Sequence, residues 1–160
     1  MPTITLSAEV AALLKDGGLL LLSWLLGGCI GWQRETHGHA AGLRTHALVC
    51  GASCLLSLLS FSGQGGDHGR VAAQVVTGVG FLGAGVILRR GNNVRGLTTA
   101  ATVWLVAGVG IAVGAGSHFA LLAILATLLA FLTLALESLK LFAKPTVEPS
   151  SNVVRVRKRE

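Results

Sequence analysis

The residues of this 160-residue chain that could bind a ligand or an ion gather at the edges of long apolar runs. They comprise one carboxylate, several guanidiniums and a group of small polar side chains, namely Glu35, Arg34, Arg44, Thr45, Arg70, Gln74, Thr77, Arg95, Thr98 and Thr99. Polar groups within a membrane-spanning segment are costly and are often functional. We therefore treat this set as candidates for a ligand site or a gate at the mouth of a helix bundle.

Glu35 can be interpreted in two ways. A lone carboxylate among guanidiniums such as Arg34 and Arg44 predicts an ion-pair cluster that ties helix ends together. Alternatively, Glu35 holds a hydrated Mg²⁺, because this hard cation takes oxygen ligands and keeps several waters. His37 and His39 could with Glu35 suit a transition metal, but nothing in the sequence fixes the geometry of such a site. No resident cofactor is expected, and Mg²⁺ enters only as a substrate or ligand.

The composition excludes most soluble classes of protein. Hydrophobic residues make up 52% of the chain and charged residues 12%, and the mean hydropathy is +0.70. A soluble domain carries about 25% charged residues, and a 16.4 kDa globule has too little interior to hide this much apolar surface. We therefore expect lipid to surround most of the chain. No nucleophile–base pair is evident, so an enzyme is not expected.

Charged residues are absent from four runs, 17–33, 45–66, 71–88 and 96–136. Because a helix rises about 1.5 Å per residue, roughly 20 residues cross a hydrocarbon core of about 30 Å. The last run is long enough for two crossings. The sequence thus predicts an all-α, polytopic membrane helix bundle with about five transmembrane helices, near 17–33, 45–62, 71–89, 97–114 and 119–139. The first is expected to extend back into Val10–Leu14, and four spans with a re-entrant segment is the main alternative.

The basic residues predict the orientation of these spans. With five spans and the N-terminus outside, eleven of the thirteen Lys and Arg residues face the cytoplasm, and only Lys15 and Arg70 lie outside. The positive-inside rule prefers this arrangement. The chain then divides into an outer N-terminal segment (1–16), a transmembrane domain (17–142) and a basic cytoplasmic tail (143–160). This excess of cytoplasmic bases accounts for the pI of about 10.1 without nucleic acid as a partner. The tail bases are expected to lie near anionic headgroups, and a disordered, solvated tail is the alternative.

Small residues recur inside the predicted spans at the spacing of helix-packing motifs. In lipid, close backbone approach through small residues supplies the packing that the hydrophobic effect supplies in water. We therefore predict packing roles, within the chain or in a homo-oligomer with a dimer favoured, for Gly27, Gly31, Gly78, Gly80, Gly83, Gly85, Gly110 and Gly114. The literal GxGxxG match at 78–83 lacks the strand and the acidic residue that a dinucleotide site needs.

Four stretches of the chain resemble the MgtC/SapB family of bacterial membrane proteins. They are GCIGWQRE (28–35), AGLRTHALV (41–49), RVAAQVVTGVGFLGAGVI (70–87) and VRGLTTAATVW (94–104). The resemblance covers roughly residues 17–140, which is nearly all of the predicted membrane part. Virulence-type members continue into a soluble C-terminal domain, whereas this chain ends in a short basic tail, so roles that depend on that domain are not expected here.

The resemblance implies a protein of the bacterial inner membrane, which makes the N-terminal segment periplasmic. It also implies a link to growth in low Mg²⁺ and, in pathogens, to survival inside host cells. Some members have been proposed to transport Mg²⁺, and others to restrain the F-type ATP synthase through contacts in the membrane.

Two functional hypotheses of different classes follow. The first is a Mg²⁺ transporter or channel, and the second is a regulator that acts by helix contacts on a membrane partner. None of the seven acidic residues lies in the middle of a predicted span, so a Mg²⁺ path would depend on water, backbone carbonyls and neutral polar side chains. We expect a role in Mg²⁺ homeostasis and leave the transport step, the protein partner and the oligomeric state open.

The predicted topology can be tested by labelling single cysteines in a cysteine-free background in intact cells. We expect an impermeant thiol reagent to reach positions 65 and 117 from the periplasm, because the positive-inside rule places both loops outside. Positions 38, 92 and 155 should react only after the cells are opened. Labelling of position 92 from the outside would overturn the orientation.

Overall fold

The structure is a computed structural model that describes residues 3–62, 68–90 and 93–142. Its elements, in chain order, are α1 (Thr3–Thr36), α2 (Leu43–Ser62), α3 (His68–Gly85), β1 (Leu88–Arg90), β2 (Asn93–Arg95), α4 (Leu97–Gly114) and α5 (Ser117–Phe142). The five predicted helices are therefore confirmed, and the fold is an all-α bundle with one small hairpin. The predicted basic tail, 143–160, lies outside the described residues.

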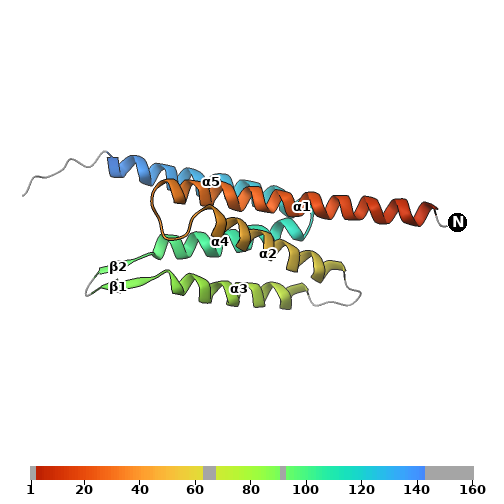
Figure 1. The fold of residues 1–160 in the computed structure, drawn as a ribbon, viewed down its shortest axis with the longest axis horizontal. Helices are drawn as coiled ribbons and strands as arrows, with labels where there is room; N and C mark the ends of the chain where they lie inside the picture. The colour runs from red at the N-terminus through yellow and green to blue at the C-terminus, as the bar shows by residue number, and fades with distance from the viewer. Residues whose placement is uncertain (1–2, 63–67, 91–92, 143–160) are drawn as a thin grey trace, which may run out of the picture.

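The helices run side by side along one axis (Figure 1). α2 and α4 pack on each other and both pack on α1, while α5 lies against α4 and α1. α3 is peripheral, because it packs mainly on α4 and touches α2 much less. The loop after α1, the hairpin and the end of α5 all lie at one end of the bundle, which we call the hairpin end, and the N-terminus lies at the other (Figure 1).

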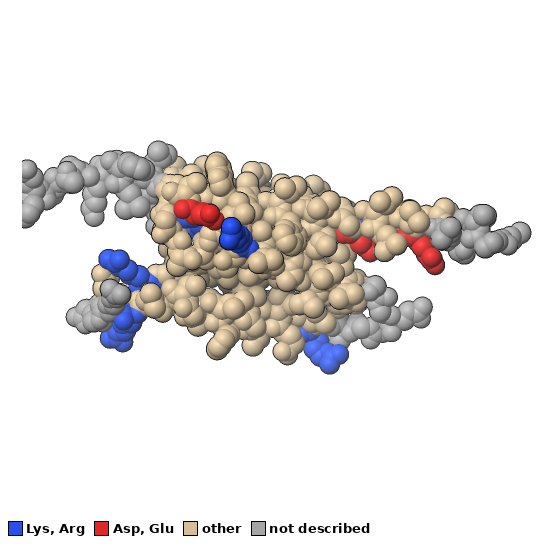
Figure 2. All heavy atoms as spheres, in the orientation of Figure 1, with Lys and Arg blue, Asp and Glu red and all other residues tan. Residues whose placement is uncertain are grey.

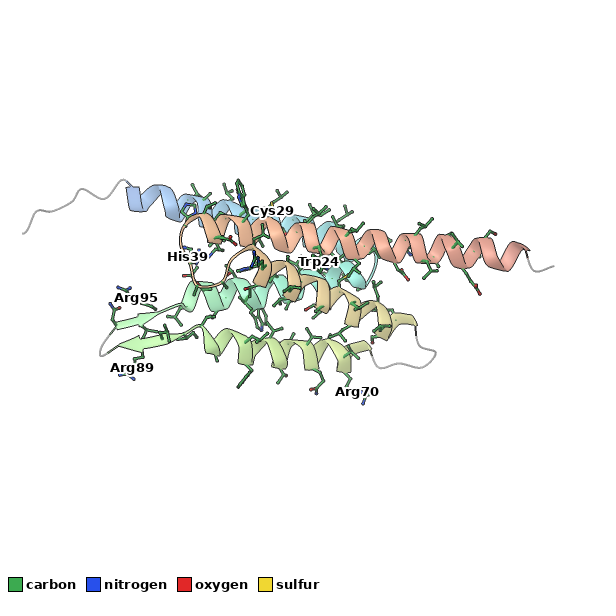
Figure 3. All side chains as sticks on the ribbon, in the orientation of Figure 1. Trp24, Cys29, His39, Arg70, Arg89 and Arg95 are labelled. Carbon is green, nitrogen blue, oxygen red and sulfur yellow. The ribbon has the colours of Figure 1, made fainter. Side chains whose placement is uncertain are left out.

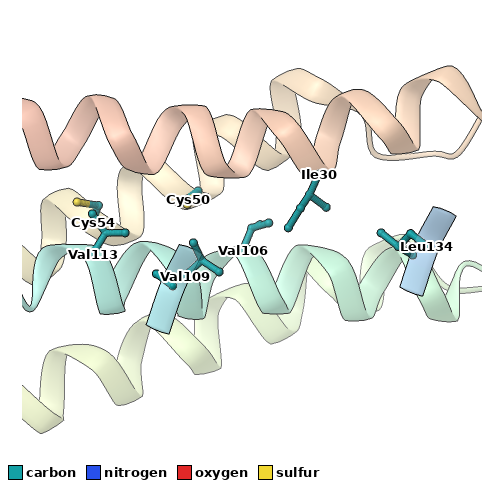
Figure 4. Close-up of a cluster of buried hydrophobic side chains, with 8 residues drawn as sticks. Ile30, Cys50, Cys54, Val106, Val109, Val113 and Leu134 are labelled. Carbon is teal, nitrogen blue, oxygen red and sulfur yellow. The ribbon is translucent and has the colours of Figure 1, made fainter. Parts of the chain in front are cut away.

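Small apolar side chains fill the centre of the bundle. Figure 4 shows the largest cluster, in which α1, α2, α4 and α5 meet. Its members are Ile30, Cys50, Cys54, Val106, Val109, Val113, Ala123 and Leu134. The three cysteines are free thiols, and Cys50 and Cys54 fill space between α2 and its neighbours as small hydrophobic side chains do.

Four helical segments are long and apolar enough to cross a membrane, judged by length and composition. They are Ser7–Thr36, Leu43–Phe61, Leu97–Gly114 and His118–Leu136. α3 falls outside this set; it spans 18 residues and carries Arg70, Gln74 and Thr77. The predicted end of the third span, near 89, is wrong, because the chain leaves the helix at Gly85 and turns into the hairpin. β-branched Val86 and Ile87 follow that glycine and favour extended backbone.

α1 is much longer than a bilayer requires. Its 34 residues span about 51 Å, against a hydrocarbon core of about 30 Å. The prediction that the first span extends back through Val10–Leu14 is confirmed. The N-terminal part of α1 projects past the other helices and carries the acidic residues Glu9 and Asp16 (Figure 2).

Four glycines lie where α2 meets its two main neighbours. A Cβ added at Gly27 or Gly31 of α1 would come within 2.6–2.8 Å of backbone at the start of α2. A Cβ at Gly114 of α4 would lie 2.6 Å from a carbonyl oxygen of α2, and one at Gly110 would also meet such an oxygen. These glycines thus let three helix backbones touch, which is the role that small residues have in lipid.

Three other predicted packing glycines behave differently. Gly78, Gly80 and Gly85 of α3 have no neighbouring atom within 4 Å of an added Cβ, and Gly83 makes only ordinary contact with Ala100, at 3.6 Å. α3 turns the face that carries Val79 and Gly83 toward α4, and the Gly80 face points away from the bundle. Within this chain Gly83 therefore packs on α4, whereas Gly78, Gly80 and Gly85 make no close helix contact, and their packing in a homo-oligomer stays a prediction.

The glycine contacts predict a pair of contrasting substitutions in α4. We expect Gly110→Ala to destabilise the bundle by about 1–3 kcal/mol, since the new methyl group would push against the α2 backbone. Gly108 lies on a different face of the same helix, and a Cβ added there meets no atom within 4 Å. Gly108→Ala should therefore be neutral or slightly stabilising. Thermal unfolding in detergent measures both. Equal melting temperatures for the two variants would show that α2 and α4 are not in backbone contact.

Candidate functional site

The structure separates the candidate residues into two groups. Figure 3 shows Arg89 and Arg95 on the hairpin at one end and Arg70 at the far end of α3. Arg34, Glu35, Arg44, Thr45, Arg95, Thr98 and Thr99 all belong to segments that meet at the hairpin end. Arg70, Gln74 and Thr77 lie on the exposed surface of α3 toward the opposite end. The candidates thus do not form one site.

A buried polar chain crosses three helices near the hairpin end. The Arg34 guanidinium of α1 donates from Nη2 to the Thr99 hydroxyl of α4 at 3.4 Å, and Arg34 is only 3% exposed. On the same helix Thr102 lies 3.0 Å from Nε2 of His46, which comes from α2 and is fully buried. Nδ1 of His46 lies 2.9 Å from the Gly42 carbonyl. We call Arg34, Thr99, Thr102 and His46 the polar chain.

The hydrogen bonds of the polar chain determine how its protons can be placed. A carbonyl oxygen only accepts, so His46 carries a proton on Nδ1. In a neutral ring Nε2 is then an acceptor, and the Thr102 hydroxyl donates to it. The same hydroxyl lies 2.9 Å from the Thr99 carbonyl, and its single proton can serve only one of these acceptors at a time. The neutral ring is the form that costs least in a fully buried position beside a guanidinium.

Sequence reasoning missed His46 and Thr102 as partners of Arg34 and Thr99. One signal was available, because Thr99 and Thr102 are three residues apart and so share a face of one helix. His46, the partner of Thr102 on α2, is 56 positions away in the chain, and only the packing of α2 on α4 brings it close.

Gln33 of α1 is a further buried polar side chain near the hairpin end. It is 5% exposed, and its Oε1 has no hydrogen-bond partner among the described residues.

Glu35 stabilises the start of α2. Its Oε2 accepts a hydrogen bond of 2.7 Å from the backbone N–H of Leu43, the first residue of that helix. A carboxylate in this position satisfies an orphan donor and complements the positive end of the helix dipole. Gly42 leaves the room for it, because a Cβ there would lie 2.5 Å from the same oxygen.

The cap on α2 is the contact that the structure gives Glu35, and the expected ion-pair cluster with the guanidiniums stays a prediction. Arg34 is turned inward toward Thr99, while Arg44 and Arg95 lie exposed on separate elements. Thr45 and Thr98 are also exposed, and the Thr77 hydroxyl donates to the Ala73 carbonyl of its own helix at 2.9 Å. Among these candidates, a direct hydrogen bond joins Arg34 and Thr99.

A metal site at Glu35 finds no support in the described part of the chain. No group of three or more His, Cys, Asp and Glu residues lies close enough there to hold an ion. The Nδ1 of His37 lies 2.7 Å from the Gln33 carbonyl, so this ring belongs to the end of α1. Glu35 would therefore offer Mg²⁺ a single carboxylate whose other role is to cap α2.

Comparison with known proteins shows which family the chain belongs to. The model of the MgtC family matches residues 20–140, a range that contains the polar chain and the glycine contacts of α2. The chain belongs to the MgtC family. With four helices suited to cross a bilayer, this MgtC-family chain is a membrane protein.

Three relatives show how far the likeness extends. Protein MgtC of Salmonella typhimurium is 52% identical over 97 residues, which cover 61% of this chain and 42% of the relative. Protein MgtC of Brucella abortus is 50% identical over 101 residues, which cover 61% and 42%. The "Putative magnesium transporter YhiD" of Escherichia coli K12 is 45% identical over 108 residues, which cover 62% and 50%. The matches span half or less of each relative's length, and no solved structure matches this MgtC-family chain.

The cap on α2 predicts a graded response at Glu35. Glu35→Ala removes the acceptor for the Leu43 amide and should cost about 1 kcal/mol of stability, as the loss of a helix cap does. Glu35→Gln keeps a side-chain oxygen in reach and should cost less. The melting temperatures of the two variants in detergent check this. Equal losses for the two variants would show that the charge, which both substitutions remove, matters more than the oxygen acceptor that Gln keeps.

Proposed function

We propose that this chain is a membrane component of magnesium homeostasis that supports growth when Mg²⁺ is scarce. The observation that carries the proposal is that the MgtC family model matches residues 20–140. The name of one relative, "Putative magnesium transporter YhiD", connects that relative with magnesium. The match covers 42% of Salmonella typhimurium MgtC, and four helices of this chain are suited to cross a bilayer, so the proposed role is one that helices in the bilayer can perform.

The geometry supports a role without Mg²⁺ passing through the bundle of a single chain. The Arg34 guanidinium is almost fully buried between α1 and α4, and it would repel a divalent cation at short range. The runs 45–66, 71–88 and 96–136 contain no carboxylate that could offset this repulsion. The bundle is also closely packed at α2, where glycines bring the backbones together. These features support a protein that acts on a membrane partner.

Transport is the second candidate function, and it is favoured by the naming of the relative YhiD as a magnesium transporter. In this case the ion path would lie between copies of the chain or beside the peripheral α3, away from Arg34. The two candidates differ in one measurable property, which is whether the purified protein alone moves Mg²⁺.

The polar chain provides the test in cells. Thr102→Val removes the hydroxyl that meets His46 and leaves a buried ring nitrogen without its partner, at a cost of about 1–3 kcal/mol. We expect this variant to restore growth at low Mg²⁺ poorly in a strain that lacks the native protein. Thr127→Val is the matched control, because Thr127 is equally buried but donates only to the Ala123 carbonyl of its own helix.

Flux measurements separate the two candidate functions. Liposomes that contain only the purified protein and a Mg²⁺-sensitive dye should show no uptake above empty liposomes. Uptake that is lost in Thr102→Val and kept in Thr127→Val would establish transport in place of regulation. Normal growth of the deletion strain at low Mg²⁺ would contradict a role of the protein in magnesium homeostasis.

A further inference from the structure

A long groove runs along the outside of the bundle between α2 and α3. It encloses about 660 Å³, within the range of about 300–1,000 Å³ that is usual for ligand sites. Its walls are mostly apolar and include Leu48, Ala52 and Leu56 of α2 and Val75, Gly78 and Leu82 of α3. The groove exists because α3 packs mainly on α4 and contacts α2 less.

The chemistry of the α3 wall changes along the groove in one direction. Arg70, Gln74, Gly78 and Leu82 are spaced four residues apart, so they lie along one side of the helix. Arg70 comes first, at the end of α3 away from the hairpin (Figure 3), and it is one of the residues that line the groove. The amide follows one turn deeper, and every lining residue of α3 beyond it is apolar or glycine.

The length of the groove matches one leaflet of a bilayer. Arg70 and Leu82 are twelve residues apart, which is about 18 Å along a helix. Half of a hydrocarbon core of about 30 Å is about 15 Å. A helix of a second copy of the chain would instead be expected to lie along the whole bundle.

We propose that this groove binds one anionic phospholipid of the bilayer. The headgroup phosphate accepts hydrogen bonds from Arg70, whose planar guanidinium suits two phosphate oxygens. The ester carbonyls of the glycerol accept from the Gln74 amide N–H groups. One acyl chain lies between the apolar residues of α2 and α3, and the space beside Gly78, where an added Cβ meets no atom within 4 Å, receives it. This inference concerns the purified protein and stands apart from the magnesium role.

Two glycines on α3 provide a matched pair of variants. Gly78 lines the groove and Gly80 does not, and an added Cβ at either position meets no atom within 4 Å. Both Gly78→Leu and Gly80→Leu should therefore fold, which circular dichroism and elution as a single species confirm. We expect Gly78→Leu to lose a dioleoyl phosphatidylglycerol molecule that wild type and Gly80→Leu retain in native mass spectrometry of the full chain.

The headgroup contact has a separate test. Arg70→Gln should weaken binding of dioleoyl phosphatidylglycerol about fivefold, the effect of one base near an anionic surface. Arg95→Gln, an exposed arginine on the hairpin at the opposite end, should leave the affinity unchanged. Dioleoyl phosphatidylcholine should bind more weakly than the anionic lipid to wild type and should respond little to Arg70→Gln.

Three outcomes would overturn the proposal. Equal lipid retention by Gly78→Leu and Gly80→Leu would place the lipid elsewhere. Unchanged affinity in Arg70→Gln would remove the headgroup contact. A shift of Gly78→Leu from a dimer to a monomer, with lipid retention unchanged, would show that a second copy of the chain fills the groove.

Discussion

The arrangement of the bundle depends on the close approach of α2 to α1 and α4. Hydrophobic burial does not hold helices together in lipid, because the surrounding acyl chains are as apolar as the side chains. Glycines at 27, 31, 110 and 114 instead allow the backbones to come into contact. Dispersion contacts over this shared surface, with small side chains such as Cys50 between the helices, hold the centre in one arrangement.

This close packing buries the residues of the polar chain, so their polar atoms need hydrogen-bond partners within the protein. With α2 and α4 in contact, His46 and Thr102 are driven into the same water-free space, where an unpaired polar atom is expensive. The Thr102 hydroxyl meets the His46 ring, and the Arg34 guanidinium donates to the Thr99 hydroxyl one turn away, so side chains of three helices pair here. The result fixes the rotation of each helix about its own axis more sharply than apolar contacts alone would. A positive charge held in this place also gives the bundle an electrostatic character that disfavours divalent cations.

The peripheral position of α3 follows from the same geometry. Because α1 and α4 occupy two sides of α2, α3 rests on α4 and leaves a groove open toward lipid. Its outward face carries Gly80, which has open space around it, and its groove side carries the polar Gln74. This helix is thus the part of the MgtC-family chain whose surroundings are supplied by other molecules, whether lipids or proteins.

The sequence by itself determined the helical class, the number of helices and the ends at which charges gather. These properties depend on local composition, since an uncharged run of about 20 residues in lipid must satisfy its backbone hydrogen bonds within a helix. The glycines of α1 and α4 that meet α2 were also visible as GxxxG pairs. Only the tertiary structure decided which face of each helix is buried. Apolar residues that face lipid and those that face protein look alike in the sequence, so the open face of Gly80 and the pairing of His46 with Thr102 could not be predicted. The cap that Glu35 places on α2 likewise depends on how the chain folds back between the two helices.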